Sequence, residues 1–125
     1  MLILDTNILI AYFGGEEDVI RQIQEWRRQY QPLVISSITE CELLSYPKLS
    51  EIEEERIEQF LRENVDAFVY DGILARRAAL VRRIVPALKL PAAAIAALAL
   101  QLNAPLVTRN IRDFKKISAL EVVGI

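Results

Sequence analysis

The sequence predicts an α/β fold, in which helices flank a mostly parallel central sheet. Short apolar segments alternate along the chain with longer segments whose apolar residues recur at helical spacing. The first two short segments are apolar on both faces, which is typical of strands in a parallel sheet covered by helices. The chain has 125 residues, of which 53% are hydrophobic, and this suffices for a dense core. We therefore expect a single domain over residues 1–125.

Five short segments are expected to form the strands of this sheet. Residues 1–4 are an apolar run that ends at Asp5-Thr6-Asn7, and these polar residues mark the end of a strand and the start of a helix. The other expected strands are residues 33–36, 67–70, 106–108 and 121–123. The last of them resembles an edge strand. Alternation of these strands with helices is typical of a parallel sheet.

The segments between the strands are expected to be helical. Helices are predicted over residues 7–13, 16–30, 37–46, 50–61, 71–85 and 91–102. Ser37 and Glu40 have the spacing of a capping box at the start of the third helix, which gives Glu40 a structural role. Pro91 suits the first turn of the last helix. That helix is apolar all round, so we expect it to be buried and to pack closely through its alanines.

The composition excludes several kinds of site. The chain has no His, which excludes Ser-His-Asp and Cys-His sites and the usual His-containing zinc sites. Cys41 is the only cysteine, so no intramolecular disulfide can form. The hypothesis that this α/β chain binds a nucleotide cofactor has little support, because no glycine-rich phosphate loop follows the first strand. No targeting segment or membrane-length apolar run is found, and we expect a cytoplasmic protein.

The charges are distributed unevenly along the chain. The net charge is −2, but residues 1–66 carry 6 Lys/Arg and 14 Asp/Glu, whereas residues 67–125 carry 9 Lys/Arg and 3 Asp/Glu. A nearly neutral total can therefore conceal a basic surface that holds a phosphate backbone. Alternatively, the two halves interleave in space and the asymmetry averages out.

Acidic residues follow three of the expected strands. Asp5 follows the first strand, Glu42 lies shortly after the second, and Asp113 comes after the fourth. Parallel strands end at one edge of a sheet, so these carboxylates can converge there. Clustered carboxylates repel one another unless a cation balances them, and Mg²⁺ or Mn²⁺ prefers such oxygen ligands. The alternative for Asp5 alone is an ordinary helix cap.

Four segments, in order, resemble one known family. They are Leu4-Asp5-Thr6-Asn7, the segment from Ser36 to Leu43 with the pattern S-x-x-T-x-x-E-L, Lys89-Leu90-Pro91 before an alanine-rich helix, and the segment from Leu106 to Phe114. Together they resemble the PIN-domain ribonucleases, and among them the VapC-type toxins of toxin–antitoxin pairs. The resemblance covers essentially the whole chain. It implies a PIN-like three-layer sandwich.

The resemblance also implies an activity and a set of site residues. Proteins of this family hold one or two Mg²⁺ or Mn²⁺ ions on carboxylates and hydrolyse RNA as metal-dependent endoribonucleases. By correspondence, Asp5 and Glu42 are catalytic metal ligands, supported by Thr6 and Thr108. The expected partners are an RNA substrate, a cognate antitoxin protein and a second copy in a homodimer.

The segment after the fourth strand carries the remaining expected site residues. The last acidic position falls on Asn110 or Asp113, and Asp113 is favoured as the metal ligand, with Asn110 as a polar neighbour. Arg109 and Arg112 are expected to contact RNA.

One departure from the family pattern bears on activity. The family normally has Asp directly after Lys-Leu-Pro, where this chain has Ala92. Alanine cannot bind a metal ion or orient water, so turnover is expected to be weakened or lost. Either Ala92 replaces a native aspartate in an engineered variant, or the chain is a naturally degenerate PIN domain. The second case leads to an alternative function, a non-catalytic module that binds RNA or protein.

Overall fold

The sheet has five strands, all paired in parallel, in the order β3-β2-β1-β4-β5. The computed structural model describes all residues from 1 to 125. The strands are β1 (Leu2–Leu4), β2 (Leu33–Ser36), β3 (Asp66–Phe68), β4 (Leu106–Val107) and β5 (Val122–Val123). In the central strand, Ile3 pairs with Val34 of β2 and with Leu106 of β4. The predicted α/β fold with a parallel sheet is confirmed, and β5 is an edge strand as expected.

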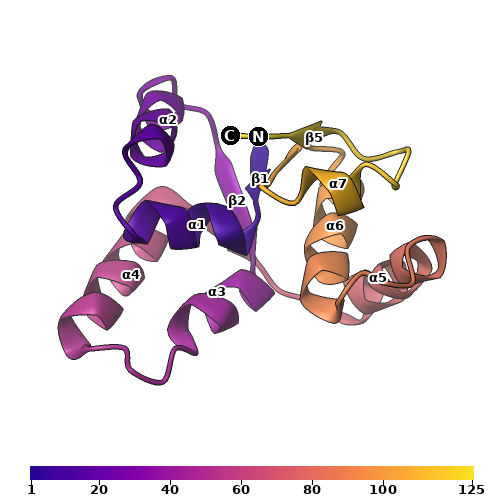
Figure 1. Cartoon of the computed structure of the whole chain (residues 1–125), viewed down its shortest axis with the longest axis horizontal. Helices are drawn as coiled ribbons and strands as arrows, with labels where there is room; N and C mark the ends of the chain where they lie inside the picture. The colour runs from indigo at the N-terminus through magenta and orange to yellow at the C-terminus, as the bar shows by residue number, and fades with distance from the viewer.

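Seven helices flank the sheet. They are α1 (Thr6–Phe13), α2 (Glu17–Arg28), α3 (Ser37–Leu44), α4 (Glu51–Asn64), α5 (Gly72–Ile84), α6 (Leu90–Leu102) and α7 (Ile111–Phe114). Figure 1 shows α1, α2 and α4 to the left of the central strands and α5, α6 and α7 to the right. This arrangement is the expected three-layer sandwich.

Burial on both faces of the sheet explains why its strands are apolar at successive positions. Neighbouring residues of a strand point to opposite faces. In β1, Ile3 belongs to a buried cluster with α5 and α6, whereas Leu4 belongs to a second cluster with α1, α2 and α4. Val34 and Ile35 alternate in the same way. The alanine-rich stretch of α6, residues 93–99, is at most 1% exposed, which confirms that this helix is buried.

The start of α3 differs from the prediction. Ser36, and not Ser37, caps this helix, and its hydroxyl accepts a hydrogen bond from the Ile38 N–H at 3.1 Å. The Ser37 hydroxyl instead accepts from the Tyr70 N–H at 3.0 Å. The capping box predicted for Ser37 and Glu40 is therefore wrong. Two successive serines give the same local signal, and only the pairing of β2 with β3 decides which of them ends the strand.

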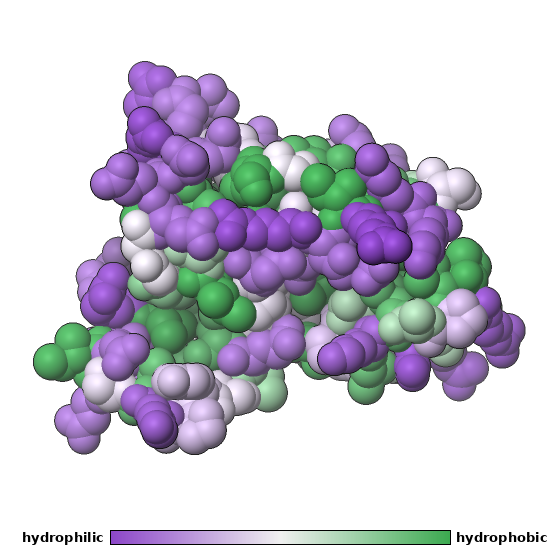
Figure 2. Space-filling model, in the orientation of Figure 1, coloured by the Kyte–Doolittle hydropathy of each residue, from purple (hydrophilic) through white to green (hydrophobic).

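Other local features follow their sequence signals. A capping box forms at Ser50 and Glu53, where the acidic helix was expected to begin. The short helix α7 was not predicted. The outer surface of α2, a charged helix that buries Val19 and Ile23, is hydrophilic in Figure 2. None of the helices combines the length and the apolar character required to cross a membrane.

The uneven charge of the sequence persists in three dimensions. The acidic first half supplies α1 to α4, and the basic second half supplies α5 to α7. The two halves form separate hydrophobic clusters with opposite faces of the sheet. The charges of the two halves therefore lie mainly on opposite sides of the sheet, and they meet in one ion pair, between Glu16 and Arg109.

Candidate functional site

Three central strands bring the expected site residues to one edge of the sheet. β2, β1 and β4 are neighbours and run in the same direction. Asp5 follows β1, helix α3 follows β2, and Thr108 follows β4. These segments meet at the carboxyl edge, the position at which open α/β sheets bind ligands.

Asp5 is buried at this edge and uses both carboxylate oxygens. It is 7% exposed and caps α1, its Oδ1 accepting from the Thr6 N–H at 2.8 Å. Its Oδ2 accepts from the Thr108 hydroxyl at 2.6 Å. Asp5 is therefore a helix cap, as one interpretation of the sequence held. It also connects the end of β1 to the end of β4, which a cap alone does not require.

The environment of Asp5 disfavours its charge. Burial raises the pKa of the Asp5 carboxyl above its ordinary value, and the nearby Glu42 carboxylate adds to this effect. The hydrogen bonds from Thr108 and from the Thr6 backbone act in the opposite direction but do not outweigh burial. A buried carboxylate beside a second carboxylate is an arrangement that a bound cation would stabilise.

Glu42 reaches the same edge from α3. Its Oε1 accepts from the Thr6 hydroxyl at 2.7 Å, although the residue as a whole is exposed. The Thr6 hydroxyl also lies 3.0 Å from the hydroxyl of Thr39, which is fully buried. Thr6 thus contacts both carboxylates, Asp5 through its backbone and Glu42 through its side chain. Glu42 and Thr39 are three residues apart on α3, so both project from one face of that helix.

Thr108 is the centre of a second group of hydrogen bonds. Its hydroxyl accepts from the Asn110 N–H at 2.9 Å and from the Asn7 side-chain amide at 3.4 Å. The Asn7 side chain in turn accepts from the Arg109 N–H at 3.3 Å. Thr6 and Thr108 were expected to contact the carboxylates, and they do. Asn110 contributes its backbone N–H here.

Sequence reasoning missed Thr39 and Asn7 as members of this site. Thr39 carries a signal that could have revealed it, because a residue three positions before Glu42 shares its helix face. Asn7 belongs to the segment Leu4-Asp5-Thr6-Asn7 that resembles the family, but its partner Thr108 lies 101 residues away in sequence.

Neither Asp113 nor Ala92 adds a carboxylate to the pair formed by Asp5 and Glu42. Asp113 lies on α7, half-exposed, with its Oδ1 3.9 Å from the ammonium group of Lys116. Helix α6 leads into β4, so it begins at the carboxyl edge, where Ala92 is its third residue. The first turn of α6 has no acidic residue, and its cap residue Lys89 makes no side-chain capping bond. No group of three or more Cys, Asp or Glu side chains is arranged to hold a metal ion.

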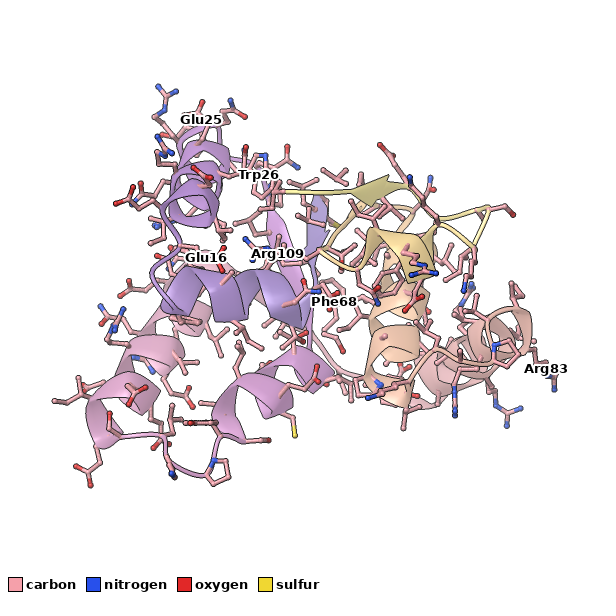
Figure 3. The ribbon with its side chains drawn as sticks, viewed as in Figure 1. Glu16, Glu25, Trp26, Phe68, Arg83 and Arg109 are labelled. Atoms are coloured by element: carbon pink, nitrogen blue, oxygen red, sulfur yellow. The ribbon has the colours of Figure 1, made fainter.

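Arg109 forms an ion pair with Glu16, which precedes α2. Its guanidinium Nη1 donates to Glu16 Oε1 at 3.0 Å, and its Nη2 contacts Glu16 Oε2. Figure 3 shows the two side chains meeting above α1. The hydrogen bond from Arg109 lowers the pKa of the Glu16 carboxyl. Arg112, by contrast, is exposed and forms no ion pair.

A family model described as the PIN domain matches residues 2–120. The chain belongs to the PIN domain family. This match confirms the resemblance that the sequence motifs indicated. No curated protein sequence matches the chain significantly.

Solved structures that resemble this PIN domain come from toxin–antitoxin systems. A toxin–antitoxin complex from Klebsiella pneumoniae has 31% identity and a TM-score of 0.81, with 98% of this chain and 96% of that chain covered. VapBC-1 from nontypeable Haemophilus influenzae has 27% identity and a TM-score of 0.80 over the same shares of the two chains. DNA-bound VapBC from Salmonella typhimurium has 25% identity and a TM-score of 0.81, again over 98% and 96%. The predicted likeness to VapC-type PIN proteins is thereby confirmed.

Proposed function

We propose that this PIN domain is a VapC-type toxin whose site is built for metal-dependent hydrolysis of RNA, with turnover weakened by Ala92. The observation that carries the proposal is the pair of Asp5 and Glu42 at the carboxyl edge, each held by a hydroxyl group. The 31% identity to a chain of a toxin–antitoxin complex supports it.

The donor atoms of this pair fit a hard divalent cation. Asp5 and Glu42 offer only oxygen ligands, and Mg²⁺ is commonly bound by one or two carboxylates together with water and substrate phosphates. A cation would also offset the burial that raises the pKa of Asp5. Mn²⁺ accepts the same ligands. By correspondence with the family, we propose Asp113 of α7 as the further acidic residue of this site.

The chain's own residues would hold and orient the reacting groups. A bound Mg²⁺ or Mn²⁺ would polarise the scissile phosphate and lower the pKa of a water molecule. Thr108 and Thr6 keep the carboxylates of Asp5 and Glu42 in fixed directions by donating hydrogen bonds to them. Arg112 is free to contact the RNA backbone, and Arg109 would do so in competition with Glu16.

Replacement of Ala92 tests the catalytic role. In the Ala92→Asp variant, a third carboxylate at the start of α6 should raise Mn²⁺-dependent cleavage of structured RNA by about 100-fold or more. The matched control is Ala92→Asn, which has the same size without the charge and should stay as weak as the parent. The catalytic proposal fails if Ala92→Asp and the parent are equally inert in Mg²⁺ and in Mn²⁺.

A second function, a non-catalytic PIN module that binds RNA, is favoured by one specific observation. Ala92 stands where the family has an acid, and no group of three acidic side chains is preassembled. Such a module would bind RNA through its basic residues without a divalent cation. RNA binding that weakens steeply with salt but needs no divalent cation would favour this module, because contacts to phosphates by basic residues depend on salt and not on a metal ion.

An apolar groove beside the site suits the antitoxin that the proposed function requires. The groove has a volume of about 490 Å³ and lies between α1, α3 and α4. Its apolar lining is formed by Ile10, Phe13, Leu43, Pro47, Leu49 and Ile57. Figure 2 shows hydrophobic side chains exposed in this region. Glu42 also lines the groove, so an antitoxin segment seated there would reach a site carboxylate.

A second copy of the chain is the other expected partner. Ile73, Leu80 and Ile84 of α5 are 53–63% exposed, and Val69 just before this helix is 73% exposed. Contiguous exposed apolar side chains of this kind mark interaction surfaces. We propose this surface for the homodimer contact. The cytoplasmic location stays a prediction.

A further inference from the structure

Thr39 is a buried hydroxyl group with a single partner. It is 0% exposed, and its only hydrogen bond in the structure is the 3.0 Å contact with the Thr6 hydroxyl. Thr6 also lies 2.7 Å from Glu42 Oε1. The three side chains therefore form a chain of contacts that begins in the core and ends at the site. No role was expected for Thr39 from the sequence.

The number of hydroxyl protons determines where the Thr6 proton goes. Each threonine hydroxyl carries one proton and can accept through its lone pairs, whereas an ionised carboxylate can only accept. The proton of Thr6 must therefore go to Glu42, and 2.7 Å is a typical length for a hydroxyl that donates to a carboxylate. Thr6 therefore donates to Glu42, and the 3.0 Å contact with Thr39 fixes where the Thr6 oxygen lies.

We propose that Thr39 is a positioning residue that orients Glu42 through Thr6. With its oxygen held by Thr39, the Thr6 hydroxyl has one low-energy direction, and that direction faces Glu42 Oε1. The same residue holds Asp5 Oδ1 through its backbone N–H at 2.8 Å. Thr39 thus stabilises the relative placement of both carboxylates without touching either. The inference rests on the proposed function only for its consequence, the binding of a divalent cation.

The competing explanation is that Thr39 fills space in the core. Its methyl group would then matter and its hydroxyl would not. Thr39→Val keeps the shape and removes the hydroxyl, whereas Thr39→Ser keeps the hydroxyl and removes the methyl group. The two variants therefore give opposite results under the two explanations. Thr39→Ala, which removes both groups, replaces the valine variant if that protein does not fold.

The first measurement needs no metal. Three-bond scalar couplings in NMR report the χ1 rotamer of Thr6. We expect a single rotamer in the parent and in Thr39→Ser, and averaging between rotamers in Thr39→Val. A single Thr6 rotamer in Thr39→Val would overturn the proposal, since Thr6 would then be held without Thr39.

The second measurement is the affinity for Mn²⁺, by calorimetric titration or electron paramagnetic resonance. Groups that orient metal ligands commonly affect affinity 10- to 100-fold, and Thr39 acts one bond further away. We expect Thr39→Val to weaken Mn²⁺ binding by about 3- to 10-fold and Thr39→Ser by less than about 2-fold.

A double-mutant cycle separates action through Thr6 from other effects. In a Thr6→Val background, Thr39→Val should change the Mn²⁺ affinity by less than about 1.5-fold, because the link to Glu42 is already broken. An equal loss in both backgrounds would overturn the proposal. If no variant, including the parent, binds Mn²⁺, the proposed function fails, and the rotamer measurement alone still decides the role of Thr39.

Discussion

The Asp5→Asn substitution tests whether the buried carboxylate is retained for function at a cost in stability. Asparagine has the same shape and is an equally good helix cap. Its carbonyl oxygen can accept from the Thr6 N–H. Its amide can donate to the Thr108 hydroxyl oxygen if it replaces the long 3.4 Å contact from the Asn7 amide, and the Thr108 proton then loses the carboxylate that accepts it. The substitution therefore removes a charge from a site that is 7% exposed and leaves the packing in place.

Burial of this charge predicts the direction of the stability change. The pKa of Asp5 is raised in the folded state, chiefly by burial, so the folded protein binds this proton more tightly than the unfolded chain does. The contribution of Asp5 to the free energy of unfolding of the parent therefore falls as the pH rises from about 3.9, the unfolded value, through the higher folded value. The Asp5→Asn variant has no ionisable group at this position, so its free energy of unfolding does not decline with pH for this reason. At neutral pH we expect it to be more stable by about 1 kcal/mol, or about 3–5 °C in Tm for a chain of this size.

The assay is urea unfolding at a series of pH values from about 3 to 7, repeated with Mn²⁺ at pH 7. The stability of the variant relative to the parent should increase with pH and then level off. Mn²⁺ should stabilise the parent and have little effect on the variant, because a ligand stabilises only the folded state that binds it. Asp66→Asn is the matched control. It makes the same chemical change at an exposed position in β3, and its stability should stay within about 0.5 kcal/mol of the parent.

Two results would refute this reasoning about Asp5. One is a lower stability of Asp5→Asn than of the parent at pH 7 without metal. The other is a difference between the two proteins that does not change with pH. The first would mean that the hydrogen bonds from Thr6 and Thr108 outweigh the burial of the charge, and the second that they balance it.

Two further predictions concern the basic residues and the anchoring of α7. Charge reversal at both Arg109 and Arg112 should abolish RNA binding measured by fluorescence anisotropy and remove its salt dependence, and an unchanged affinity would exclude this edge as the RNA surface. Phe114 ends α7 and is 0% exposed, so Phe114→Ala should lower the free energy of unfolding by about 3–5 kcal/mol in chemical denaturation. A loss below about 1 kcal/mol would mean that α7 is not anchored through this ring.

The sequence predicted most elements because their signals are local or periodic. The strand at Leu33–Ser36 was predicted with its observed bounds, since apolar residues on both faces indicate a buried strand. The helix predicted over residues 91–102, observed from Leu90 to Leu102, was expected to be buried because it is apolar all round. The cap of α3 was predicted one residue too late, because the choice between Ser36 and Ser37 depends on the pairing of Ser36 with Phe68 in β3. The helix α7 is too short for a periodic pattern to reveal it.

The candidate site was predicted in part, because some of its residues are marked by local sequence signals. The first strand and its Asp5-Thr6-Asn7 end indicated a cap and a candidate ligand at once, and the structure shows that Asp5 caps α1 while its second oxygen binds Thr108. The sequence alone also showed that Ala92 stands where the family has an acid. These are statements about residue type and order along the chain.

Only the tertiary structure decided which side chains meet. Thr6 lies 33 residues from Thr39 and 36 residues from Glu42 in sequence, yet one hydroxyl contacts both. Arg109 pairs with Glu16 across 93 residues, so its charge is already engaged. Such contacts depend on the order of strands in the sheet, which sets what lies beside each strand end. Local sequence determines where a strand ends, but long-range packing determines which residues share that end.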